Sequence, residues 1–170
     1  SLMKLGMFYA KSIEASKIPF DMLYGPAYKG IPLVSSIVIA FASLGRNVPF
    51  AFNRKEKKDH GEGGVIIGTP LKGRVLIVDD VISAGTSVNE SVNIILEEGA
   101  KPSGIAISID REEKGTGLLS AVEEIKETHH LPVCHLTSLQ EIMRYIEHHE
   151  TYASHISAMR DYQKVYGIKA

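Results

Sequence analysis

The sequence predicts an α/β protein with a central, mostly parallel sheet and helices on both of its faces. Short apolar stretches typical of strands alternate with amphipathic stretches typical of single helices, and such strand-helix-strand units build parallel sheets. The stretches Arg74–Val78 and 104–109 are mostly apolar, as expected for strands buried on both faces. The chain has no internal repeat and no Pro/Ser-rich linker. Residues 1–170 are therefore expected to form a single domain.

Local signals place the element boundaries. Pro32 suits a first helical turn, Gly45 and Gly99 suit positions just after a helix, and Ser138 suits an N-cap. A charged, glycine-rich stretch, residues 54–64, predicts a long mobile loop or a hairpin. The expected helices and strands, in chain order, are a helix over 7–16, a strand over 20–24, a helix over 32–44, strands over 49–53, 65–68 and 74–78, a helix over 86–98, a strand over 104–109, a helix with Leu118, Leu119, Val122 and Ile125 on its apolar face, a strand over 132–136, a helix after Ser138, and a last helix with Tyr152, Ile156, Met159 and Tyr166 on one face.

Composition limits the possible partners and compartments. The 19 Lys and Arg residues against 20 Asp and Glu give a formal net charge of −1, so no global positive field attracts nucleic acid or an anionic membrane. The longest apolar run, residues 37–42, is far shorter than the roughly 20 residues of a membrane-spanning helix. Cys134 is the single cysteine, which excludes an internal disulfide and suits a reducing compartment. A soluble, cytoplasmic protein is expected.

The most informative segment is residues 78–87, where an apolar strand is followed by Asp79 and Asp80 and then by small and hydroxyl-bearing residues that open a helix. Free N–H groups at a helix start can bind a phosphate, and Gly85 allows the backbone to approach it closely. Two neighbouring carboxylates suit the vicinal hydroxyls of a ribose. The segment therefore indicates a sugar-phosphate site. The simpler alternative is that the acids only end a strand and Thr86 only caps a helix.

A second informative segment is basic. Residues 54–60 contain four Lys or Arg and two Asp or Glu, a local charge of +2 in a chain whose total is −1. Cations aimed at a departing pyrophosphate stabilise the transition state more than the ground state. The glycines that follow give the freedom that a lid needs. In isolation, such a run is more often a solvated loop.

Two smaller elements agree with a site for an anionic substrate. Residues 24–30 follow an expected strand, and their glycines favour a loop whose N–H groups are exposed to a second anion. Arg111 follows the expected strand 104–109, where its guanidinium could bind a planar carboxylate through two hydrogen bonds. The plain alternative for residues 24–30 is a glycine-proline turn without a ligand. The plain alternative for Arg111 is a surface residue that forms an ion pair.

These segments resemble known motifs. Residues 78–87 look like the phosphoribosyl pyrophosphate (PRPP) motif of type I phosphoribosyltransferases, and residues 52–64 are similar to the catalytic loop of the orotate phosphoribosyltransferases. The resemblance covers nearly the whole chain and implies the type I phosphoribosyltransferase fold with a flexible catalytic loop. It also implies that orotate and PRPP react to give orotidine 5′-monophosphate and pyrophosphate, a step of pyrimidine synthesis.

The resemblance also implies roles for single residues and a mode of assembly. It implies a homodimer in which residues 54–64 complete the neighbouring subunit's site, and Mg²⁺ that is carried mainly by PRPP rather than by a protein ligand set. Lys58, His60, Asp79 and Asp80 would take part in catalysis, and Ser83 and Arg111 would bind orotate. The residues implied to bind PRPP are Tyr28, Lys29, Arg54, Lys55, Lys58, His60, Asp79, Asp80, Val81, Ile82, Ser83, Ala84, Gly85, Thr86 and Ser87.

The chain departs from this family in two places. Ser83 stands where many members have threonine, a change that keeps the hydroxyl, and the segment that covers the base in the family is expected to be missing before Met3. Two alternative functions remain open here: a non-catalytic regulator that binds the same metabolites, and the same chemistry on another nucleobase. Numerous histidines in the C-terminal third are expected to be surface residues, since no metal-ligand spacing links them.

Overall fold

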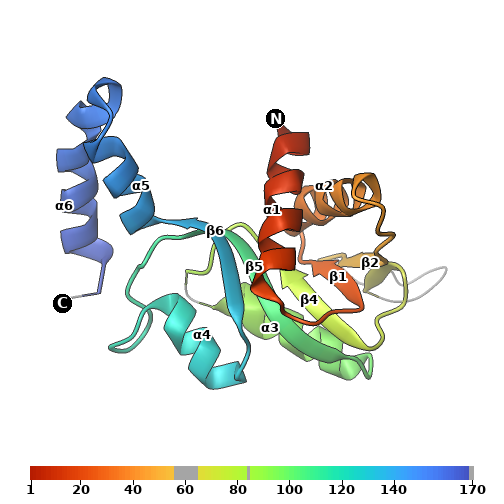
Figure 1. Ribbon diagram of the computed structural model, residues 1–170. Helices are drawn as coiled ribbons and strands as arrows, with labels where there is room; N and C mark the ends of the chain where they lie inside the picture. The colour runs from red at the N-terminus through yellow and green to blue at the C-terminus, as the bar shows by residue number, and fades with distance from the viewer. Residues whose placement is uncertain (56–64, 84, 169–170) are drawn as a thin grey trace.

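The computed structural model describes residues 1–55, 65–83 and 85–168. It is an α/β protein with one six-stranded sheet, and its elements are shown in Figure 1. The strands are β1 (Met22–Gly25), β2 (Phe50–Asn53), β3 (Ile66–Gly68), β4 (Arg74–Val78), β5 (Lys101–Asp110) and β6 (Val133–Ser138). The helices are α1 (Leu2–Ser16), α2 (Gly30–Ser43), α3 (Thr86–Glu97), α4 (Ala121–His129), α5 (Leu139–Glu147), the 3₁₀ helix η1 (Glu150–His155) and α6 (Ile156–Tyr166).

The sheet has the strand order β3-β2-β1-β4-β5-β6. All neighbours are parallel except β2 and β3, which form an antiparallel pair with Phe52 opposite Ile67. The mostly parallel sheet confirms the expected fold class. The stretch expected to be a mobile loop or a hairpin, residues 54–64, joins the antiparallel strands β2 and β3, and residues 56–64 of it lie outside the described part of the chain. From β1 the chain adds β2 and β3 toward one edge of the sheet, and from β4 it adds β5 and β6 toward the other edge. The strand order therefore reverses between β1 and β4. Ligands of open α/β sheets bind at such a point, beyond the carboxyl ends of the strands.

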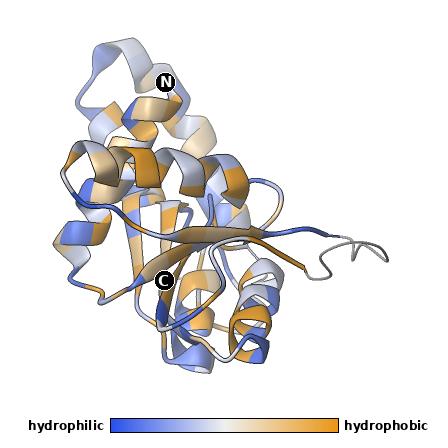
Figure 2. Ribbon diagram, turned by 90° about the vertical axis from the view of Figure 1, so that its right-hand side faces the viewer, coloured by the Kyte–Doolittle hydropathy of each residue, from blue (hydrophilic) through white to orange (hydrophobic). Residues whose placement is uncertain are grey.

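Helices pack on both faces of the sheet and enclose two apolar cores. Helices α1 and α2 cover one face, with Tyr9, Ile37 and Phe41 fully buried. Helices α3 and α4 cover the other face, with Val92 and Ile125 buried against the strands. Figure 2 shows the strands, rich in hydrophobic residues, between these helices. Burial on both faces explains why β4 has an almost wholly apolar sequence.

Most expected elements are confirmed, and three helix boundaries are wrong. The first helix, α1, begins at Leu2 and not at Met7. Leu118 and Leu119 precede α4, because Ser120 forms a capping box with Glu123 and starts the helix there. Leu118 is consequently 88% exposed. The expected last helix is divided, so Tyr152 belongs to η1 and only the later residues to α6.

The C-terminal helices stand apart from the layered body. Figure 1 shows α5 and α6 side by side, beyond the end of β6 that leads into α5. The expected N-cap at Ser138 is confirmed, since its hydroxyl accepts the N–H of Glu141. No helix of the described residues is both long and apolar enough to cross a membrane.

Gly6 of α1 lies against the backbone of α2 at Ser36, and we predict that Gly6→Ala destabilises the fold. An added Cβ would lie 2.4 Å from the carbonyl oxygen of Ser36, a backbone atom that cannot move aside without shifting α2. We expect the free energy of unfolding to fall by about 1–3 kcal/mol, measured by urea denaturation. The exposed Lys11→Ala on the same helix should change it by less than about 0.5 kcal/mol. Equal midpoints for the two variants would contradict the close packing.

Candidate active site

A cavity of about 490 Å³ opens at the carboxyl ends of β1 and β4. It lies at the topological switch point of the sheet, between the turn after β4 and the loop after β1. Pro26 and Ala27, which line it, belong to the loop over residues 24–30 that was expected to contact an anion, and Val88 is the lining residue that was not expected from the sequence. The expected site residues that line it are Tyr28, Lys29, Lys55, Asp79, Asp80, Val81, Ile82, Ser83, Gly85, Thr86 and Ser87.

The two acidic residues after β4 have different environments. Asp79 is only 6% exposed. Its Oδ1 accepts the N–H of Asp80 at 2.9 Å, and its Oδ2 accepts the hydroxyl of Ser87 at 2.9 Å. The side chain of Asp80 is 32% exposed and forms an ion pair with Lys29, with 2.5 Å between Nζ and Oδ2. Asp79 therefore braces the turn, and Asp80 presents the more accessible carboxylate to the cavity.

The pKa values of the two carboxyl groups are shifted in opposite directions. Desolvation raises the pKa of Asp79, although the hydrogen bonds from Asp80 and Ser87 oppose the shift. Partial desolvation acts in the same direction on Asp80, but the hydrogen bond and charge of Lys29 outweigh it and keep the pKa of Asp80 below its ordinary value. Asp80 is thus the member of the pair that holds its negative charge most firmly.

Residues far away in the sequence anchor the backbone of the acidic pair. Tyr9 of α1 is fully buried, and its hydroxyl donates to the carbonyl oxygen of Asp79 at 2.8 Å. Ser108 of β5 donates to the carbonyl oxygen of Asp80 through both its hydroxyl, at 2.6 Å, and its N–H, at 2.9 Å. Neither residue was predicted from the sequence, because a single Tyr or Ser within a helix or a strand gives no local signal of a role at the site.

The turn that follows provides the expected place for a phosphate. The backbone N–H groups of Ser83, Gly85 and Thr86 donate to no acceptor within the described ranges. Gly85 adopts a φ of 72°, and a Cβ there would lie 2.8 Å from Cδ1 of Ile125, so only glycine fits. The hydroxyl of Ser87 already donates to Asp79. Phosphate donors in this turn are therefore chiefly backbone N–H groups and the exposed hydroxyls of Ser83 and Thr86.

The loop after β1 faces this turn across the cavity. Asn53, at the end of β2, accepts the N–H of Ala27 at 2.8 Å and so holds the loop. The N–H groups of Tyr28 and Lys29 have no acceptor among the residues that the structure describes. The Tyr28 side chain is 66% exposed, and Nζ of Lys55 lies 5.3 Å from its ring centroid. This arrangement leaves two N–H groups and two ammonium groups near the second anion position.

The remaining expected residues lie in different places. Arg54 lines a neighbouring cavity of about 470 Å³ together with Lys55, which lines both cavities. Lys58, His60 and Ala84 lie outside the described residues. Arg111 does not line the first cavity but reaches its edge, because its Nη2 donates to Oγ of Ser83 at 2.6 Å.

The described residues contain no group of three or more His, Cys, Asp or Glu side chains that could hold a metal ion. The acidic pair fits a different role for a divalent cation. Asp80, with its exposed carboxylate in the cavity, could contact an ion whose other oxygen ligands come from a polyphosphate and water.

The comparisons with known proteins agree with this site. A family model for the phosphoribosyl transferase domain matches residues 1–127. The orotate phosphoribosyltransferase of Chromobacterium violaceum is 55% identical over 168 residues, which cover 99% of this chain and 78% of the relative. That of Nitrosospira multiformis is 58% identical over 169 residues, which cover 99% of this chain and 74% of the relative. The crystal structure of orotate phosphoribosyltransferase from Francisella tularensis superposes with a TM-score of 0.83 at 37% identity, covering 98% of this chain and 80% of that chain.

The fold, the acidic pair and the phosphate turn define the class of protein, which is a type I phosphoribosyltransferase. Within this class the three similar chains described above carry the same activity in their names. The chain belongs to the family of orotate phosphoribosyltransferases.

Tyr9 and Tyr24 offer a matched test of the anchor beneath the acidic pair. Both hydroxyls are buried, but that of Tyr24 has no hydrogen-bond partner within the described ranges. We expect Tyr9→Phe to lower the free energy of unfolding by about 1–2 kcal/mol, because the carbonyl of Asp79 loses a buried donor. Tyr24→Phe should be neutral or stabilising, since it removes an unsatisfied hydroxyl. Thermal denaturation measures both, and an equal loss in the two variants would contradict the anchoring role.

Proposed function

We propose that this protein transfers the phosphoribosyl group of PRPP to orotate and releases pyrophosphate. The observation that carries the proposal is the cavity at the switch point, where one edge of the sheet brings together the acidic pair, the phosphate turn and the basic residues. The relatives at 55% and 58% identity support orotate as the acceptor. They disfavour the two alternatives, a regulator without activity and a transferase for another nucleobase.

Each part of the cavity would hold a different part of PRPP. The free N–H groups of Ser83, Gly85 and Thr86 suit the 5′-phosphate, at the start of α3 where the helix dipole favours negative charge. The carboxylate of Asp80 suits the ribose hydroxyls as a hydrogen-bond acceptor, and its negative charge would stabilise positive charge that develops on the ribosyl carbon. Asp79, which is engaged by Ser87, orients the turn that carries both functions.

The leaving pyrophosphate would lie toward the basic side of the cavity. Lys29, Lys55 and the free N–H groups of the loop after β1 are placed there, and we propose that Arg54, Lys58 and His60 join them from a neighbouring subunit. Negative charge on the pyrophosphate increases as the bond to the ribose breaks, so these groups stabilise the transition state more than bound PRPP. Orotate can react as an anion, and the reaction then needs no general base.

Mg²⁺ is part of the proposal as an ion that arrives with PRPP. When bound, it would neutralise negative charge on the pyrophosphate. Asp80 is the described residue best placed to touch it, because its carboxylate lines the cavity and is exposed. We further propose a cytoplasmic enzyme, in keeping with a single cysteine, Cys134, whose half-buried position and raised pKa from burial favour an unreactive thiol.

The choice of nucleobase can be tested directly. We expect pyrophosphate release from PRPP with orotate and Mg²⁺, and none with uracil, adenine or hypoxanthine, because these bases lack the carboxylate that Arg111 would bind. Removal of Mg²⁺ with a chelator should abolish the release. Turnover with a purine alone would refute orotate as the substrate, whereas binding of PRPP without turnover of any base would favour the regulator.

Shared sites in a homodimer can be tested by mixing variants. Lys58→Ala and Asp80→Ala should each lose most of the turnover. Random mixing should restore up to about one quarter of the wild-type activity, because half of the dimers are mixed and each of these contains one intact site. The exposed Asp161→Asn, mixed with Asp80→Ala, should keep about one half of the wild-type activity with or without subunit exchange, and so controls for activity lost through the mixing procedure itself. No recovery in verified mixed dimers would contradict a site completed by the neighbouring subunit.

A further inference from the structure

Within the described part of the chain, Arg111 is held through one nitrogen of its guanidinium group. Its Nη2 donates to Oγ of Ser83 at 2.6 Å and to Oε2 of Glu113 at 2.8 Å. Its Nε is buried and has no hydrogen-bond partner among the described residues. A buried N–H without an acceptor is costly, so this donor indicates an acceptor that the described residues do not supply.

Glu113 is in turn fixed from its other side. Its second carboxylate oxygen, Oε1, accepts a hydrogen bond from the hydroxyl of Tyr162, which lies on α6. The side chain of Glu113 is only 16% exposed. The ring of Tyr162 packs against that of Tyr166, with 4.8 Å between the centroids. The result is a chain of side-chain hydrogen bonds that runs from α6 through Glu113 and Arg111 to Ser83 at the edge of the cavity.

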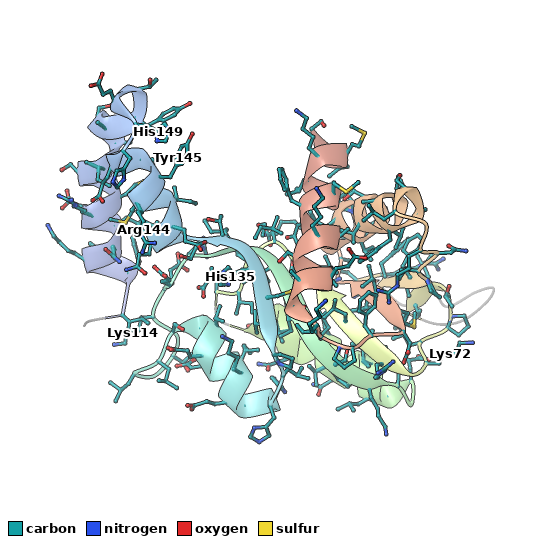
Figure 3. All side chains as sticks on the ribbon, in the orientation of Figure 1. Lys72, Lys114, His135, Arg144, Tyr145 and His149 are labelled. Atoms are coloured by element: carbon teal, nitrogen blue, oxygen red, sulfur yellow. The ribbon has the colours of Figure 1, made fainter. Side chains whose placement is uncertain are left out.

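Backbone contacts connect the same two segments. The N–H of Lys114 donates to the carbonyl oxygen of Tyr166 at 2.8 Å, and Glu113 forms an antiparallel bridge with Gly167. Figure 3 shows Lys114 close to the C-terminal end of α6. The strand that delivers Arg111 is therefore tied to α6 directly after the arginine, and the Tyr162 hydroxyl does not carry this attachment alone.

We propose that Glu113 and Tyr162 are positioning residues that fix the guanidinium of Arg111 for the carboxylate of the base. This inference rests on the proposed function and extends it to residues outside the motifs. A long arginine side chain loses rotamer freedom when it binds a ligand, and a guanidinium already held by Glu113 and Ser83 loses less of it. The negative charge of Glu113 also keeps the arginine from pairing with Asp80 or another acid near the cavity.

Tyr162 and Tyr166, one helical turn apart on α6, give a matched pair of variants. Tyr162→Phe removes the hydroxyl that binds Glu113 and keeps the ring. Tyr166→Phe is the control, because its hydroxyl makes no hydrogen bond within the described part of the chain and its ring belongs to the same contact. Glu113→Gln keeps the length of the side chain but removes its charge, and provides a second variant that acts on the same link.

The test compares the two substrates of the reaction. For Tyr162→Phe we expect the KM for orotate to rise about three- to tenfold, as for the loss of one net hydrogen bond, and the KM for PRPP and kcat to stay within about twofold. Glu113→Gln should raise the KM for orotate at least as much. Calorimetry should show weaker binding of orotidine 5′-monophosphate to both variants, with unchanged binding of ribose 5-phosphate. Tyr166→Phe should match the wild type in every measurement.

Three outcomes would overturn the inference. Tyr162→Phe could behave as Tyr166→Phe does, in which case the hydroxyl has no role in base binding. The KM values for orotate and PRPP could rise together with a lower melting temperature, which would assign a purely structural role. A wild-type protein that does not turn over orotate would refute the proposed function together with this inference, whereas an active wild type with unaffected variants would refute this inference alone.

Discussion

The site depends on how the backbone is held where β4 ends. Asp79 and Asp80 follow the last residue of β4, and their carbonyl oxygens need hydrogen-bond donors from other elements. Tyr9 from α1 and Ser108 from β5 supply those partners, and the N–H of Asp79 donates to Ala106 of β5. These hydrogen bonds fix the backbone at Asp79 and Asp80. The turn that follows is thereby held in place, although its own N–H groups at the start of α3, which have no acceptor among the described residues, remain available to a ligand. The packing of α1 and β5 is therefore connected to the chemistry of the cavity through a few hydrogen bonds.

Much of the fold and of the cavity followed from local sequence. The bounds of β4 are those expected, since residues 75–78 are apolar up to the first acid and buried on both faces. The cavity contains the acidic pair together with Tyr28 and Lys29, because the carboxyl ends of β1 and β4 are neighbours in a parallel sheet. The spacing of apolar residues predicted that Leu118 belongs to the helix, but the capping box at Ser120 starts α4 only after that residue. Apolar residues before a cap continue the helical pattern without belonging to the helix.

The residues that could not be predicted act over long sequence distances. Tyr9 lies 70 positions from Asp79, and Tyr162 lies 49 positions from Glu113. Nothing in their neighbourhood distinguishes these tyrosines from ordinary half-apolar helix residues. The sequence contains a weak indication of the Arg111–Glu113 ion pair, because the acid follows the arginine by two residues. The contact of Glu113 with Tyr162 depends on where α6 packs, which the local sequence does not show. Such contacts follow from the tertiary arrangement and not from propensity or spacing.

The pairing of β2 with β3 has a consequence for the variation that this protein tolerates. The N–H of Arg54 donates to the carbonyl oxygen of Val65 at 2.8 Å, so the two ends of the intervening stretch are clamped together by the hairpin. The entropy of closing a stretch of chain grows only slowly with its length. Insertions and deletions between these two residues should thus leave the folding equilibrium almost unchanged. The basic residues there can therefore change during evolution without first requiring a more stable scaffold.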